Sequence, residues 1–199
     1  VQLKSVLKAT TKWVEHPAQM RALGFCVSVE HAKFMAERFS KLGIPAEYLS
    51  GDHSLEERNS AIGRLRRRDI NVVFSVDVLG EGVDVPDVDT LLLLRPTQSP
   101  VVFAQQLGRG LRLAPGKGSC LVLDFIGQHR TEYRIEERYR ALLDPANGPV
   151  KEQIASGFPF LAAGCSITLE QVAAERILAS LKAITTPLGF KAMAKDLKT

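Results

Sequence analysis

Short apolar runs that alternate with helix-like stretches are the feature that most limits the fold of this 199-residue chain. The runs are nearly continuous in apolar residues, as is typical of strands buried on both faces of a parallel sheet. The predicted strands cover residues 23–29, 46–49, 70–76, 90–94 and 119–125. Between the first two, Ala32, Met35 and Phe39 recur at helical spacing. The alternation predicts an α/β fold with a parallel sheet covered by helices on both faces.

Capping residues place the boundaries of several helices. Ser54-Leu55-Glu56-Glu57 is a capping box, which begins a helix after the second strand. Ser99-Pro100 combines an N-cap with proline at the first helical position, and it predicts a helix that ends at Pro115-Gly116. Further helices are predicted over residues 3–15, over 131–143 and from Thr168 onward.

The composition changes after this alternating region. Residues 144–166 are rich in Pro, Gly and Ala with short apolar patches, which indicates a linker or an irregular cover. We therefore expect an N-terminal helix at 1–19, the sheet-containing lobe at 20–145, and a linker with a helical C-terminal extension at 146–199. Because the chain begins at Val1 rather than Met, we also expect it to be a piece of a longer protein.

The charge balance is mildly basic, with 26 Lys and Arg residues against 22 Asp and Glu residues and a net charge of +4. Such a balance is compatible with a polyanionic partner but does not require one. Four arginines lie close together at positions 64, 66, 67 and 68. Contact with phosphates and an ordinary solvated helix face explain this cluster equally well.

The cysteines Cys26, Cys120 and Cys165 lie far apart, without a CxxC pair or a nearby histidine cluster, so no metal site is expected. Their odd number and apolar surroundings indicate reduced thiols in a cytoplasmic protein. No apolar run approaches the ~20 residues of a membrane span. The first residues do not have the pattern of a signal peptide. We therefore expect a cytoplasmic location and no membrane partner.

The predicted helix that begins at Pro100 has two different faces. Phe103, Leu107 and Leu111 lie on one side, whereas Gln105, Arg109 and Arg112 lie on the opposite side, which should face outward. Gly108 and Gly110 lie beside this polar stripe, although each interior glycine destabilises a helix by about 1 kcal/mol relative to alanine. Glycine permits close approach of a ligand, and arginine offers paired donors to phosphate. An anion site and a solvated basic face explain the spacing equally well.

A loop from Asp77 to Asp84 follows the third predicted strand. In open α/β sheets the loops at the carboxyl ends of strands carry the ligand site. A carboxylate such as Asp84 can accept hydrogen bonds from ribose hydroxyls. Taken alone, an ordinary acidic turn is the better explanation of this loop.

The helix that begins at Pro100, the loop from Asp77 to Asp84 and two further segments resemble the motifs of superfamily 2 helicases. Gln105-x-x-Gly108-Arg109-x-x-Arg112 is similar to motif VI, and the segment from Ser75-Val76-Asp77 to Glu81-Gly82-Val83-Asp84-Val85-Pro86 resembles motif V. Phe25 to His31 resembles motif IV, and Ser50-Gly51-Asp52 resembles the turn that follows it. Their order and spacing are those of the second RecA-like lobe of these helicases, over roughly residues 20–130.

The resemblance implies that ATP binds in a cleft between two RecA-like lobes, of which this chain is the second. By motif match, the catalytic residues are Arg109 and Arg112 as arginine fingers, with Gln105 orienting the phosphates. Residues Gly82, Asp84 and Gly108 would bind ATP, and residues Ser28, Gly51 and Ser75 would contact the nucleic-acid backbone. The N-terminal lobe of the same parent chain would supply the P-loop lysine, the Mg²⁺ ligands and the catalytic glutamate.

The chain contains no complete P-loop. In Ala114-Pro115-Gly116-Lys117-Gly118-Ser119, the residue after the lysine is glycine, where a P-loop needs Ser or Thr, and the segment leads into a predicted strand instead of a helix. An Asp-Glu-x-His box is also absent from the sequence. We therefore expect half an active site, which hydrolyses ATP poorly by itself.

These features predict the C-terminal motor lobe of an ATP-dependent helicase. The resemblance is closest to the bacterial DEAD/DEAH-box branch of restriction-enzyme motor subunits and the excision-repair helicase, because Glu81-Gly82-Val83-Asp84 ends motif V. Many RNA-directed relatives have Arg-Gly there, so Glu81 favours DNA over RNA. Two alternatives remain: a duplex translocase that remodels or restricts DNA without unwinding it, and a non-catalytic RecA-like interaction module.

Overall fold

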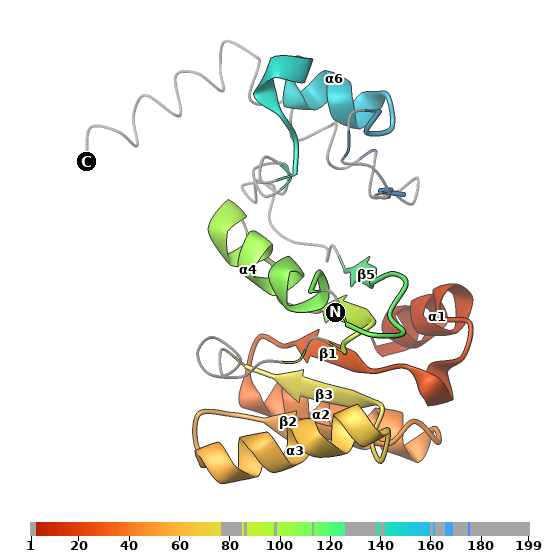
Figure 1. Cartoon of the computed structure of the whole chain (residues 1–199), viewed down its shortest axis with the longest axis vertical. Helices are drawn as coiled ribbons and strands as arrows, with labels where there is room; N and C mark the ends of the chain where they lie inside the picture. The colour runs from red at the N-terminus through yellow and green to blue at the C-terminus, as the bar shows by residue number, and fades with distance from the viewer. Residues whose placement is uncertain are drawn as a thin grey trace, which may run out of the picture. The chain divides into compact units, whose positions relative to one another are not determined.

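The computed structural model describes residues 3–76, 85, 87–97, 99–112, 114–125, 139, 142–159, 161, 166–168 and 175. The chain forms two compact units. The first contains residues 1–96 and 105–127, and the second contains 97–104 and 128–199. Figure 1 traces both along the chain.

A five-stranded parallel sheet forms the centre of the first unit. The strands are β1 (Ala22–Phe25), β2 (Ala46–Leu49), β3 (Val72–Ser75), β4 (Thr90–Leu93) and β5 (Leu121–Asp124). Their spatial order is β2-β3-β1-β4-β5, and every neighbouring pair is parallel. Because Ser75 pairs with both Phe25 and Leu49, and Asp124 pairs with Leu93, the carboxyl ends of all the strands lie level at one edge. The predicted parallel α/β sheet is confirmed.

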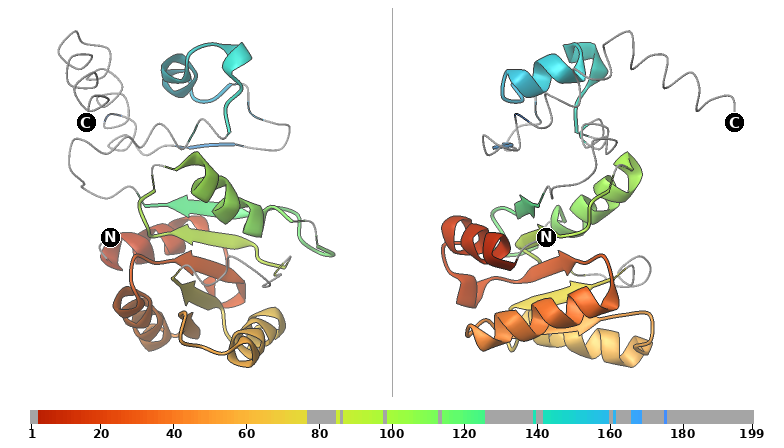
Figure 2. Two further views of the ribbon diagram at one scale, coloured as in Figure 1. Left: turned by 90° about the vertical axis from the view of Figure 1, so that its left-hand side faces the viewer. Right: turned by 180° about the vertical axis from the view of Figure 1, so that it is seen from behind.

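Helices cover both faces of this sheet, as predicted. The helices of the first unit are α1 (Leu3–Trp13), the short η1 (Pro17–Gln19), α2 (Val29–Lys41), α3 (Leu55–Arg67) and the C-terminal half of α4 (Pro100–Gly110). Figure 2 shows α1 and α2 on one side of the sheet and α3 and α4 on the other. This arrangement is a RecA-like α/β lobe.

The core between the sheet and the α1–α2 side depends on one glycine. Phe74 of β3 and Phe39 of α2 are fully buried and meet edge to face, with ring centroids 5.1 Å apart. The Phe74 ring covers Gly24 of β1, where the methyl group of an alanine would lie 2.3 Å from a ring carbon. Only a residue without a side chain therefore allows this ring to pack across the neighbouring strand.

Capping side chains stabilise the first turns of α2 and α3, the two helices that follow β1 and β2. Ser28 is the N-cap of α2, and its hydroxyl accepts a hydrogen bond from the His31 backbone N–H at 3.2 Å. In α3 the predicted capping box is confirmed, because Ser54 and Glu57 each accept a hydrogen bond from the other's backbone N–H. The strand predicted to continue to residue 29 ends at Phe25, since the chain turns at 26–28 to begin α2.

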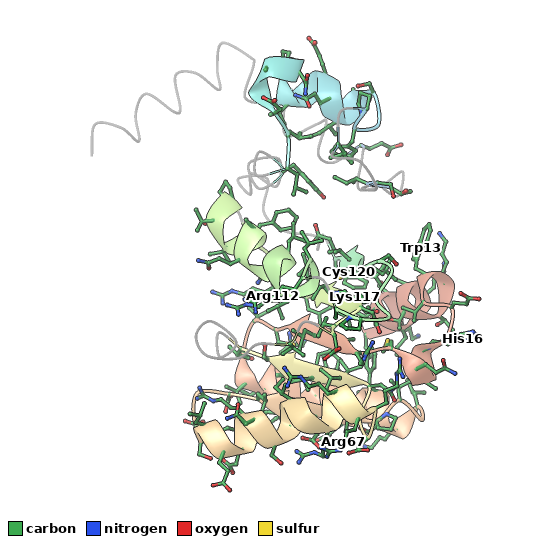
Figure 3. All side chains as sticks on the ribbon, viewed as in Figure 1. Trp13, His16, Arg67, Arg112, Lys117 and Cys120 are labelled. Carbon is green, nitrogen blue, oxygen red and sulfur yellow. The ribbon has the colours of Figure 1, made fainter. Side chains whose placement is uncertain are left out.

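The arginine cluster after the second strand has partners within the protein. On α3, Arg64 forms an ion pair with Glu47 of β2, and Arg67 pairs with Asp69 at 2.9 Å. Arg66 lies 3.6 Å from a carboxylate oxygen of Asp87, and Arg68 donates to the Gln19 carbonyl. Arg67 is labelled in Figure 3. Of the two interpretations, the structure favours a helix face with local ion pairs.

The second unit contains a short helix that the sequence did not predict. The 3₁₀ turn η2 (Pro145–Asn147) and helix α6 (Val150–Ala155) lie in the stretch expected to be a linker or an irregular cover. Gln153 is buried, and its amide donates to the carbonyls of Asp144 and Gly148 at 3.0 and 2.8 Å. Tyr139 contacts the rings of Phe103 and Phe158. The predicted helices at 131–143 and from Thr168 onward lie almost wholly outside the described residues.

Among the described residues, no helix has both the length and the apolar character needed to cross a membrane.

Candidate functional site

The C-terminal half of α4 presents the predicted polar stripe to the outside. Gln105 and Arg112 are exposed and Arg109 is partly buried, whereas Leu107 on the inner side is buried. Arg109 thus lies on the outer side of α4 as predicted, whereas Arg112 is exposed but follows the end of the helix and is not part of a helical stripe. The prediction for Leu111 is wrong, because α4 ends at Gly110 and Leu111 is 58% exposed. The inner face is completed instead by Gln106 and Gly110.

The two glycines beside this stripe have different surroundings. A methyl group at Gly110 would lie 2.5 Å from the Cys120 sulfur and 2.8 Å from the Leu91 side chain. Close packing on the sheet therefore explains Gly110. Gly108 is exposed, and a methyl group there would meet nothing within 4 Å. Packing gives no reason for a glycine at 108, so the open space beside Arg109 is available for close approach of a ligand.

Residues 114–119, which resemble an incomplete P-loop, contact the end of α4 through Lys117. The Lys117 ammonium group donates to the backbone carbonyls of Gly110 and Arg112, the second at 2.9 Å. Figure 3 shows Lys117 close to Arg112 and Cys120. The ammonium group thus binds the end of α4, and the segment leads into β5 as the sequence predicts.

Three other predicted residues lie at the carboxyl edge of the sheet. Ser28 follows β1, Gly51 follows β2, and Ser75 is the last residue of β3. Gly51 is exposed and Ser28 is partly buried. Ser75 is only 1% exposed, and its hydroxyl has no hydrogen-bond partner among the described residues. The fold thus brings together the three positions assigned to the nucleic-acid backbone, at an edge where ligands of open α/β sheets bind.

Two residues that were not expected from the sequence fix the turn around Gly51. The ring nitrogen Nδ1 of His53 accepts a hydrogen bond from the Ser50 backbone N–H at 3.1 Å. On the other side, the guanidinium group of Arg58 donates to the Gly51 carbonyl at 2.9 Å. Only the three-residue spacing of Ser50 and His53 could have indicated this contact, and that spacing is too common to be informative.

Two predicted ATP-binding residues, Gly82 and Asp84, lie outside the described residues, as does most of the motif V loop. Val85 and Val88, which follow it, are buried.

The described residues contain no group of three or more His, Cys, Asp or Glu side chains that could bind a metal ion. Burial shifts the pKa values of one imidazole and two thiols. Desolvation lowers the pKa of His31 below its usual value. Desolvation raises the pKa of Cys26 to about 12 and that of Cys120 to about 11. Both thiols are therefore unreactive packing residues at neutral pH.

The donor set on α4 fits a nucleoside triphosphate. Guanidinium groups bind phosphate oxygens through paired hydrogen bonds, and open space lies beside Arg109 at Gly108. A RecA-like lobe with this helix on one face and polar turns at its carboxyl edge is the class of domain that forms the second half of a two-lobe nucleic-acid motor.

Comparison with known proteins identifies the family. Residues 3–114 match the family model described as the helicase conserved C-terminal domain, and the chain belongs to this family. The described sheet and helices of the first unit thus form a helicase conserved C-terminal domain.

Two yeast proteins and one solved structure are similar to this chain. A putative mitochondrial ATP-dependent helicase, irc3 of Schizosaccharomyces pombe, is 41% identical over 61% of this chain and 20% of its own length. A putative ATP-dependent helicase, IRC3 of Saccharomyces cerevisiae, is 32% identical over 62% and 19%. The chain therefore spans about a fifth of the length of these relatives. The structure of the E. coli DEAD-box protein SrmB, bound to regulator of ribonuclease activity A, has a TM-score of 0.52 at 28% identity, covering 62% of this chain and 72% of that one.

Proposed function

We propose that this chain is the C-terminal motor lobe of a DNA-directed helicase, in the branch of restriction-enzyme motor subunits and the excision-repair helicase. The observation that carries the proposal is the outer side of α4, where Gln105 and Arg109 lie next to the open position at Gly108 and are followed by the exposed Arg112. The opposite side of the same helix is fixed on the sheet through Leu107 and Gly110. The stripe is thus supported by a packed core, as a catalytic group requires.

In this proposal Arg109 and Arg112 act on the γ-phosphate of ATP bound between this lobe and a preceding one. Charge spreads over the phosphoryl oxygens in the transition state, and a positioned guanidinium group there is worth about 10³–10⁵-fold in rate in well-studied NTPases. Gln105 orients the phosphates, Gly108 and Gly82 let the nucleotide approach, and Asp84 accepts hydrogen bonds from the ribose. Mg²⁺ neutralises phosphate charge and is bound by the preceding lobe.

The nucleic acid in this proposal lies along the carboxyl edge of the sheet. Ser28 and Gly51 contact its backbone, which positions a strand without reading its bases. Ser75 is 1% exposed and would join them only if the segment that follows β3 uncovered it. DNA is favoured by Glu81 at the end of the motif V segment. Closure of the two lobes around ATP would then couple hydrolysis to steps along the strand.

The test uses the longer parent chain that carries both lobes. Replacing Arg109 with alanine is expected to reduce DNA-stimulated ATP turnover by about 10³-fold or more, while DNA affinity stays within about threefold, because the strand contacts lie on other elements. Arg38→Ala is the matched control, since Arg38 is exposed on α2, on the other side of the sheet, where it stacks over Phe34. Unchanged turnover in Arg109→Ala would refute the finger assignment.

The same two-lobe parent chain distinguishes the helicase hypothesis from the duplex translocase hypothesis. Displacement of a labelled strand from a tailed duplex supports the helicase. ATP turnover that is stimulated by duplex DNA without any displacement supports the translocase. If neither DNA nor RNA stimulates turnover, the interaction module replaces both.

A further inference from the structure

The Lys117 side chain supplies hydrogen-bond donors to backbone carbonyls at the end of α4. The last carbonyls of a helix have no partner within the helix, and they carry the negative end of its dipole. In α4 this end lies between Gly110, the last helical residue, and Arg112, the second proposed finger. The Lys117 ammonium group donates to the carbonyls of both residues. It therefore links the helix end to the backbone of Arg112 with one positive charge.

The loop that carries Lys117 folds back toward the end of α4 at Gly110. Its backbone makes a turn in which the Lys117 N–H donates to the Ala114 carbonyl at 3.1 Å. Gly116 has φ +75°, a conformation that other residues rarely adopt. The turn reverses the chain, so that a residue seven positions after Gly110 reaches back to it. A lysine in this turn can therefore cap α4 from outside the helix.

Packing from the sheet and the Lys117 contact fix the helix end from two sides. Below it, Gly110 lies against Leu91 of β4 and Cys120, too close for any side chain. The Leu111 N–H still donates to the Leu107 carbonyl at 3.0 Å, so the helical hydrogen bonds extend one residue beyond Gly110. Arg112 comes directly after this last bond and is exposed. Its backbone position depends on the bond from Lys117 to its own carbonyl.

We propose that Lys117 is a positioning residue for ATP hydrolysis, which acts by fixing the backbone from which Arg112 reaches the γ-phosphate. The inference rests on the proposed function, because it needs Arg112 to be a finger. Misplacing a catalytic group by about 1 Å can reduce a rate by about 10²-fold. Lys117 needs no contact with ATP for this effect, and its ammonium group is already engaged with the protein.

The experiment compares three variants of the two-lobe parent chain. Lys117→Met keeps most of the apolar stem and removes the donors, Lys117→Arg keeps donors at the end of a long stem, and Lys8→Met removes an exposed lysine on α1 as the control. We expect Lys117→Met to reduce kcat for ATP by about 10- to 100-fold with KM for ATP within about twofold. Lys117→Arg should recover most of this loss, and Lys8→Met should resemble the wild type.

Hydrogen exchange supplies the second measurement on the same proteins. Lys117→Met should speed exchange of the backbone amides of residues 110–112, while exchange in the sheet strands is unchanged. Exchange that is faster throughout the lobe would indicate general unfolding and overturn the positioning role. A rise in KM for ATP with unchanged kcat would overturn it too, because that result indicates direct contact with ATP.

Failure of this inference is distinguishable from failure of the proposed function. If Arg109→Ala and Arg112→Ala both keep wild-type turnover, the proposed function fails, and Lys117 has no finger to position. If both lose turnover while Lys117→Met keeps the wild-type kcat, the motor assignment stands and only the role of Lys117 is refuted.

Discussion

Gly108 and Gly110 are two residues apart on α4 and are glycine for different reasons. At Gly110 the sheet leaves no room for a side chain, because Leu91 and Cys120 are too close. At Gly108 there is room on all sides, so helix stability alone would favour alanine. From the sequence alone, an anion site and a solvated basic face explained these glycines equally well. Packing now explains Gly110, so only Gly108 still fits close approach of a ligand.

The substitutions Gly108→Ala and Gly110→Ala should change the free energy of unfolding in different ways if only Gly110 is needed for packing. In residues 1–199, Gly110→Ala should lower the free energy of unfolding by about 1–3 kcal/mol, because the new methyl group overpacks the site. Gly108→Ala should leave it unchanged or raise it by up to about 1 kcal/mol. Urea unfolding measures both. Equal destabilisation by the two variants would contradict this explanation of the two glycines.

In the longer parent chain, ATP turnover tests the proposed role of Gly108. If ATP approaches α4 at Gly108, Gly108→Ala should weaken ATP turnover although the fold is at least as stable. A Gly108→Ala parent with full turnover would mean that no ligand approaches this position closely.

The buried thiol of Cys26 gives a residue-scale test of the core that depends on pH. Burial raises its pKa from 9.0 to about 12, so the thiol favours the folded state fully below pH 9. That stabilisation is lost as the pH rises from about 9 toward 12. Iodoacetamide reacts with the thiolate. Between pH 8 and 10, labelling of Cys26 should be far slower in the folded chain than in urea, and in urea the rate should level off above about pH 9, where the unfolded thiol is mostly ionised; peptide mass spectrometry follows both rates. Equal labelling rates in the two states would show that Cys26 is accessible.

At the scale of elements, the sequence predicted what local patterns determine. Apolar runs identified all the strands from β1 to β5, and the capping box located the start of α3. The end of α4 was placed five residues too late, because it is set by Leu91 and by Lys117, which lie outside the helix. Helix α6 was missed because its six residues carry too little periodicity, and its stability comes from the buried Gln153.

The capping box of α3 has a measurable effect on the whole lobe. Ser54 and Glu57 satisfy two backbone N–H groups at the start of the helix that follows the Gly51 turn. Ser54→Ala should cost about 1 kcal/mol, which corresponds to a fall in Tm of about 2–4 °C for a protein of this size. Ser54→Asp should retain most of the stability, and Ser5→Ala, on the exposed side of α1, is the control. A Tm for Ser54→Ala equal to that of Ser5→Ala would show that the cap is not stabilising.

At the scale of the whole molecule, the proposed function divides the ATP site between this lobe and a preceding one. Helical periodicity places Gln105 and Arg109 on the outer side of α4, and strand ends place Ser28, Gly51 and Ser75 at the carboxyl edge, whereas Arg112 follows the end of the helix. The roles of these residues stay predictions. The sequence could not predict that Lys117 and His53 fix the backbone around them, because those contacts follow from the shape of two turns. In the described residues there is likewise no cluster of metal ligands to hold Mg²⁺.

This division predicts how ATP hydrolysis depends on chain length. Residues 1–199 alone should hydrolyse ATP at the background rate, with or without DNA, because arginine fingers stabilise a transition state only when another lobe binds the nucleotide and Mg²⁺. A chain extended upstream through a preceding lobe should turn over, and single-stranded or duplex DNA should stimulate it. Arg109→Ala in the extended chain is the control for contaminating ATPases, since it removes the proposed finger and leaves the purification unchanged. Turnover by residues 1–199 that Arg109→Ala abolishes would mean that this lobe carries a complete site.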